Sequence, residues 1–236
     1  MLESIQKLPK LQELSIWNCP IDQEQPFHRL TTCDLEFLLV NPTITSLSLE
    51  RFELLHPVSI AGRINTLELY RCDMNAEQMA MLLGSVPSLE HLLLRNCSHI
   101  TTYQFYTLGR LFQQIKSLQL IDMFKNPDPI YSLSRIPTRF LEDFTQLQDL
   151  HISGYILNSM ALQYLPGSVR SLTITRTPNL HSGWFGMALH HLQRRMEIKV
   201  VGMEWSAEQQ DFLRVRYFRQ MKVSKLTRTA ECGRSV

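Results

Sequence analysis

The sequence predicts an α/β solenoid, in which about eight copies of a strand–turn–helix unit stack side by side. Three observations support this fold class. A nine-residue pattern of aliphatic and polar residues occurs eight times, its copies start about 26 residues apart on average, and all eleven prolines lie outside them. A strand with neighbours on both edges does not tolerate a residue without an N–H, so the proline positions indicate strands paired on both sides.

Each copy of the pattern has aliphatic residues at positions one, four and six. These positions are aliphatic in 23 of 24 cases, with Arg195 as the exception, whereas positions two, three and five are apolar only at Leu93 and Met196. Such a contrast predicts a strand with one buried and one polar face. The eight copies begin at Leu11, Ile44, Ile64, Leu89, Ile115, Leu147, Val169 and Arg195.

Helix-forming stretches lie between the predicted strands. Asn75 can cap a helix over residues 76–83, with Gln78 placed to return a hydrogen bond to the cap and Gly84 as the stop. Apolar residues of this stretch share one helix face. Similar stretches cover residues 101–112, 135–144, 158–165 and 183–192.

The spacing of the copies falls in the range of 20 to 29 residues found in leucine-rich repeats. We therefore expect a horseshoe-shaped leucine-rich-repeat solenoid over residues 1–203, with a parallel sheet on the concave face and helices on the convex face. Residues 204–236 are expected to form a capping helix, opened by Ser206 and Gln209, and a basic tail. An anionic partner or a role in nuclear import stays open for this tail.

Position nine of the pattern is a cysteine in three copies, at Cys19, Cys72 and Cys97, and the fourth copy continues into Ser98-His99-Ile100-Thr101. In these residues the chain resembles the cysteine-containing leucine-rich repeats of F-box proteins, over about residues 8–203. That resemblance implies the substrate-recognition part of an SCF ubiquitin ligase receptor. The other copies depart from it at position nine, where they carry Phe52, Met123, Tyr155, Thr177 and Met203.

An F-box would precede the repeats as a helical segment, but Leu11 already opens the first predicted strand. Residues 1–10 have apolar residues at helical spacing and look like the end of a preceding repeat helix. The chain is therefore expected to be either a fragment of a longer F-box protein or a repeat protein without an F-box. Ligase subunits are expected partners only if an F-box lies upstream.

Composition narrows the class of partner and the compartment. The formal charge is +2, and no run of five basic residues occurs, so nucleic acid is not the expected partner. No apolar stretch approaches the roughly 18 residues that span a bilayer, so no membrane association is expected. Five cysteines without a C-x-x-C pair favour a reducing compartment, the cytoplasm or the nucleus.

The sequence contains none of the common catalytic or metal-binding motifs. It has no phosphate-binding glycine loop, no G-x-S-x-G, no H-E-x-x-H and no zinc spacing, and we expect no enzyme activity, cofactor or metal. His91 and His151 lie two repeats apart on the predicted concave face. Cys72 and Cys97 are expected to pack as small buried side chains rather than to form a disulfide or a metal site.

The candidate binding surface is the concave face, formed by positions three, five and seven with position eight at its edge. Its first five repeats carry the aromatic, arginine and apolar side chains typical of binding hot spots. An alternative is that a missing amino-terminal segment covers Trp17 and that the arginines pair with Glu50 and Glu68. The predicted partner-binding residues are Trp17, Arg51, Tyr70, Arg71, Leu93, Arg95 and Ile121.

These observations predict a protein-binding module, and the resemblance implies the substrate-recognition part of an F-box-type ubiquitin ligase receptor. The alternative is a non-ligase scaffold that holds one protein partner in a nuclear or cytoplasmic complex. The partner itself, the oligomeric state and the role of the basic tail stay open, because exposed residues vary independently of the fold.

Overall fold

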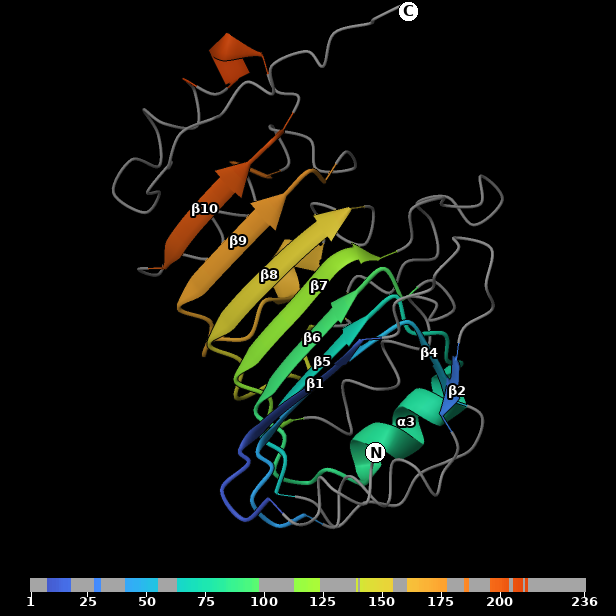
Figure 1. The fold of residues 1–236 in the computed structure, drawn as a ribbon. Helices are drawn as coiled ribbons and strands as arrows, with labels where there is room; N and C mark the ends of the chain where they lie inside the picture. The colour runs from blue at the N-terminus through green and yellow to red at the C-terminus, as the bar shows by residue number, and fades with distance from the viewer. Residues whose placement is uncertain are drawn as a thin grey trace, which may run out of the picture.

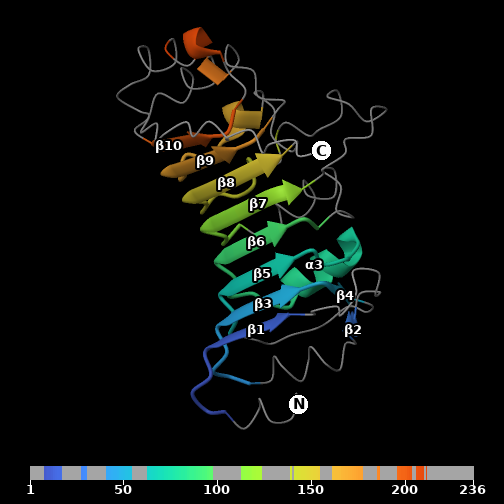
Figure 2. The ribbon, with the colours of Figure 1, turned by 45° about the horizontal axis from the view of Figure 1, so that its top comes forward.

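The eight predicted strands form one parallel sheet. The computed structural model describes residues 8–17, 28–30, 41–54, 63–97, 113–123, 139, 141–154, 161–177, 185–186, 196–203, 206–209 and 211. In sheet order, which follows the chain, the strands are β1 (Glu13–Trp17), β3 (Ser46–Glu50), β5 (Thr66–Tyr70), β6 (His91–Arg95), β7 (Ser117–Met123), β8 (Asp149–Gly154), β9 (Ser171–Thr175) and β10 (Glu197–Val201) (Figure 1). Each lies within one copy of the pattern, so the predicted strands are confirmed. Figure 2 shows them stacked in chain order, with α3 (Ala76–Gly84) to one side.

The strands are in the register that the pattern predicts. Residues at position four pair with one another from strand to strand, and those at position six form a second row beside them. Outside β1, the members of both rows are at most 3% exposed. The first row consists of Leu14, Leu47, Leu67, Leu92, Leu118, Leu150, Leu172 and Ile198.

Position nine also faces the core, as was predicted for Cys72 and Cys97. Phe52, Cys72, Cys97, Met123, Thr177 and Met203 are all buried there. The eighth copy differs from the others at its start. Its position one, Arg195, lies outside the described residues, whereas Met196 at position two is only 5% exposed and belongs to the core.

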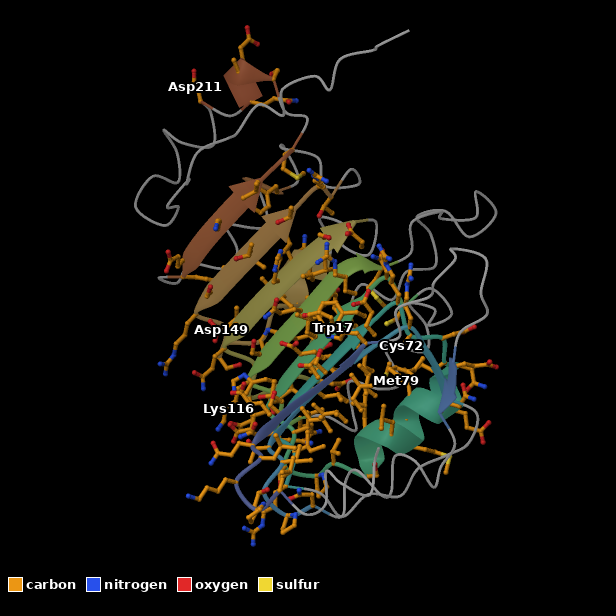
Figure 3. All side chains as sticks on the ribbon, viewed as in Figure 1. Trp17, Cys72, Met79, Lys116, Asp149 and Asp211 are labelled. Carbon is orange, nitrogen blue, oxygen red and sulfur yellow. The ribbon has the colours of Figure 1, made fainter. Side chains whose placement is uncertain are left out.

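The helix α3 confirms the predicted cap. Asn75 Oδ1 accepts a hydrogen bond from the Gln78 N–H at 2.9 Å, and Gln78 Oε1 accepts one from the Asn75 N–H at 2.7 Å. The predicted stop is one residue early, because Gly84 is still helical. Ser85, in the right-handed helical conformation, closes the helix with its N–H on the Met81 carbonyl, so no left-handed glycine is needed. Apolar residues of α3, Met79 among them, face the core under the sheet (Figure 3).

The other predicted helices are only partly described, and the residues that are described show turns or short helical segments. In the predicted stretch 158–165, of which residues 161–165 are described, the structure has a 3-10 turn, η2 (Ala161–Tyr164), which ends just before Pro166. At the end of stretch 135–144, residues 141–143 form turns rather than an α-helix, because Phe144 donates to Leu141 three residues back. Residues 101–112 lie outside the described part, as do 183–192 apart from helical residues 185–186. Among the helices described, none is long and apolar enough to cross a membrane.

A second, two-stranded sheet was not predicted. Its strands are β2 (His28–Leu30), within the long connector 20–43, and β4 (Phe52–Leu54), which follows directly on a turn at Arg51. An isolated bridge from Glu53 to Asp73 continues this pairing into the next unit. The chain therefore keeps parallel contacts after it leaves the main sheet.

The carboxyl-terminal cap is also present. Ser206 Oγ accepts a hydrogen bond from the Gln209 N–H at 3.2 Å, and Gln209 Oε1 accepts one from the Ser206 N–H at 2.9 Å. Residues 207–209 and 211 are helical, and the remainder of the predicted tail lies outside the described residues.

Because both interior rows depend on close packing, truncating one buried leucine should destabilise the protein strongly. Leu118 is fully buried in the middle of the sheet, whereas Leu14 at the same position of β1 is only half-buried. We expect Leu118→Ala to lower the free energy of unfolding by about 2–5 kcal/mol and Leu14→Ala to lower it by less than half as much. Urea titration of both variants measures the difference, and equal losses would contradict the packing described here.

Candidate binding surface

The open face of the main sheet consists of the residues at positions three, five and seven of its eight strands. Along each strand these residues alternate with the buried ones, and most of them are half-buried or exposed. The residues of α3 and η2 that pack on the sheet, such as Met79 and Leu162, belong to the core on the other side. The open face is therefore the surface on which the sheet presents side chains in a regular array.

The structure brings most of the predicted patch residues onto neighbouring strands. Position seven forms one row, in which each residue pairs with the next: Trp17, Glu50, Tyr70, Arg95 and Ile121. Leu93 lies one row inward, between Glu68 and Gln119. Trp17, labelled in Figure 3, is 72% exposed. One strand, β3, separates it from Tyr70.

Arg51 and Arg71 lie next to this row, at a left-handed turn. Position eight has a positive φ in all seven units in which it is described: at Arg51, Arg71, Asn96, Asp122, Gly154, Arg176 and Gly202. In this conformation the position-eight N–H still reaches the next strand. The Arg71 N–H, for example, donates to the Arg95 carbonyl at 2.7 Å. The turn thus extends the hydrogen-bond ladder by one residue before the chain leaves the sheet.

Arginine is a costly residue at such a turn. The left-handed region costs an ordinary L-residue about 1–2 kcal/mol, whereas glycine, asparagine and aspartate enter it more readily. Four of the seven units carry one of those three residue types, but Arg51, Arg71 and Arg176 do not. At these three positions the left-handed conformation therefore costs more stability than it would with glycine, asparagine or aspartate.

Charges on the patch are only partly compensated. The Tyr70 hydroxyl donates to Glu68 Oε2 at 3.2 Å. Burial raises the pKa of Tyr70, and the neighbouring Glu68 carboxylate raises it further. The alternative expectation paired the arginines with Glu50 and Glu68. Within the described residues, no ion pair joins Arg71 or Arg95 to either carboxylate.

The carboxyl-terminal half of the open face carries hydroxyl and imidazole groups instead. Ser153 Oγ accepts from the Asp122 N–H at 2.9 Å and donates to Asp122 Oδ1 at 3.2 Å, where the pairing of β7 with β8 is irregular. His151 Nε2 lies 3.2 Å from Thr175 Oγ1. These contacts join units 31 and 24 residues apart in sequence, so the sequence pattern did not reveal them.

The two described cysteines are buried thiols in neighbouring units. Cys72 Sγ donates to the Leu49 carbonyl at 3.4 Å, and Cys97 Sγ donates to the Leu69 carbonyl at 3.5 Å. Burial raises the pKa of Cys72 to about 11 and that of Cys97 to about 12. In the part of the chain that is described, no three histidine, cysteine or acidic side chains lie close enough together to hold a metal ion.

Comparison with known proteins gives no relative: no protein-family model matches the chain, and no curated protein matches it significantly.

The thiols of Cys72 and Cys97 should resist alkylation in the folded protein. Only a thiolate reacts, and at pH 8 both groups are protonated because burial raises their pKa values. Peptide mass spectrometry after iodoacetamide treatment should find both residues unmodified under native conditions and modified in urea. Rapid native modification of either residue would contradict its position in the core.

The stability of the protein should depend on the protonation of His151. Burial, and secondarily Lys199, lowers the pKa of His151 below its ordinary 6.5. The unfolded chain therefore takes up this proton first as the pH falls, and the free energy of unfolding decreases below about pH 6.5. Between about pH 7.5 and pH 5.5, His151→Gln should lose less stability than the native protein in urea titrations. An identical loss would show that His151 does not contribute to the pH dependence.

Proposed function

We propose that the chain is a leucine-rich-repeat module whose sheet forms the concave wall of a horseshoe, and that it binds a protein partner through the patch on β1 to β7. The patch consists of Trp17, Arg51, Tyr70, Arg71, Leu93, Arg95 and Ile121. In this proposal the chain is not an enzyme, and its role is to hold the partner.

The observation that carries the proposal is the chemistry of positions seven and eight. Exposed Trp17 and half-buried Tyr70 lie in one row with exposed Arg95, and Arg71 is exposed beside them at a left-handed turn. Aromatic rings and guanidinium groups dominate protein interfaces, because they combine apolar area with several hydrogen-bond donors. Arginine at a strained position is consistent with selection for binding rather than for stability.

The proposal has two versions, which differ in the kind of complex to which the chain belongs. The cysteines at position nine and the Ile100-Thr101 continuation favour the substrate-recognition part of an F-box-type ubiquitin ligase receptor. A scaffold that holds one protein in a cytoplasmic or nuclear complex is the second version. Retention of ligase subunits by the full gene product supports the first, and a single stoichiometric partner without them supports the second.

Removing two neighbouring side chains of the patch should strongly weaken partner binding without unfolding the domain. With Tyr70→Ala combined with Arg95→Ala, the chain loses an aromatic ring and a guanidinium from neighbouring strands. Affinity purification and quantitative mass spectrometry should show proteins that the native chain retains and that this variant loses by at least about tenfold, the loss expected when a hot spot is removed.

The matched control is Thr173→Ala combined with Lys199→Ala, which removes two side chains from neighbouring strands of the same face, at β9 and β10. This variant should retain the same proteins as the native chain. Loss of the partner with the control but not with the patch variant would move the site to the carboxyl-terminal half. If the native chain retains nothing above bare resin, the proposal of a protein-binding module is wrong.

Arg71→Gly separates binding from folding further. Glycine relieves the left-handed strain at this position, so the free energy of unfolding should stay equal or rise. Partner retention should nevertheless decrease, because the exposed guanidinium is lost. Unchanged retention with this variant would remove position eight from the binding surface.

A further inference from the structure

The two ends of the eight-stranded sheet differ in how well their core residues are covered. At the β10 end, Ile198 and Val200 are 1% and 2% exposed. At the β1 end, the equivalent residues Leu14 and Ile16 are only half-buried, and Trp17 is 72% exposed. The sheet therefore ends at β1 with apolar side chains still accessible.

The outer backbone edge of β1 is unpaired in the described part of the chain. The Gln12 carbonyl accepts from the N–H groups of Thr45 and Ser46, so it faces the neighbouring β3. Backbone groups alternate in direction along a strand. Leu14 and Ile16 thus also direct their backbone groups toward β3, and Glu13, Ser15 and Trp17 direct theirs outward. Among the described strands, β1 pairs with β3 alone, and none of them lies along its outer edge.

We propose that a second copy of this chain occupies this edge, with the two β1 strands antiparallel and Ser15 opposite Ser15. Glu13 of each copy then lies opposite Trp17 of the other. In an antiparallel pair, residues directly opposite one another exchange both of their hydrogen bonds when their backbone groups face each other. All three outward-facing residues of each strand satisfy that condition in this register.

The side chains of β1 suit this pairing. On the buried face Leu14 lies opposite Ile16, so the apolar residues that are half-buried in one copy cover those of the other. On the open face Glu13 lies opposite Trp17, and no like charges meet. A register centred on Glu13 would place two carboxylates opposite each other, which is destabilising.

A second copy fits the edge, because the alternation of exposed and half-buried side chains along β1 is symmetric about Ser15, with half-buried Leu14 and Ile16 on either side of it. A two-fold axis perpendicular to the sheet at Ser15 generates a closed dimer with an isologous interface. It also leaves both open faces on the same side, so the partner-binding patch of each copy stays accessible. The dimer does not depend on the proposed function.

Ser15→Cys tests the register directly. Opposed residues of such a pair have Cα atoms about 5.5 Å apart, which lies within the range that a disulfide spans. Under mild oxidation this variant should form a covalent dimer of twice 27.5 kDa on a non-reducing gel. Thr173→Cys is the matched control at the same position of β9. This control and the native chain should form no covalent dimer on the gel. No dimer with Ser15→Cys, or equal dimer with both variants, would overturn the proposal.

Ser15→Lys tests the association without a covalent bond. Ser15 is exposed, so the substitution should leave the fold intact, which circular dichroism checks. In sedimentation velocity at rising concentration, the native chain and the control Thr173→Lys should approach twice 27.5 kDa, whereas Ser15→Lys should stay at 27.5 kDa because two ammonium groups meet on the axis. A native chain that stays monomeric at every concentration, or a Ser15→Lys variant that still dimerises, would contradict the proposed dimer.

Discussion

The architecture of this chain depends on two adjacent rows of aliphatic side chains that run across the sheet from strand to strand. Because each strand contributes one residue to each row, the register of every pair is set by the burial of these residues. A shift by one residue would turn the aliphatic side chains to solvent. The hydrogen-bond ladder, the inward-facing position nine and the regular array on the open face all follow from this constraint.

Features with a short repeat or a local hydrogen bond could be predicted from the sequence. The strands, their register and the caps at Asn75 and Ser206 are of this kind. The strand β2 could not be predicted, because three residues are too short to show alternation. Around Leu141 the structure has turns where the sequence predicted a helix, because apolar residues three positions apart occur in both kinds of structure. Just before β10, Met196 lies in the core, although the same position of the pattern is polar in the other units.

The candidate surface was predictable for the same reason, because strand alternation specifies which residues share a face. The left-handed turn at position eight was not predicted, although a signal existed: Asn96, Asp122, Gly154 and Gly202 are residue types that tolerate positive φ at the same place in each unit. The arginines in the other units obscured it. Contacts such as Ser153 with Asp122 depend on the distance between strands, which the pattern within one unit does not contain.

The uneven cover at the two ends of the sheet also has a mechanical consequence. Each strand of the main sheet pairs only with its immediate neighbours, so the sheet can lose strands one at a time from an end. In an isolated chain, fraying begins where the least apolar surface is lost, at β1, and progresses toward β10. Amide hydrogen exchange would then form a gradient along the sheet, and a pulling force applied to the amino terminus would peel the strands off in chain order.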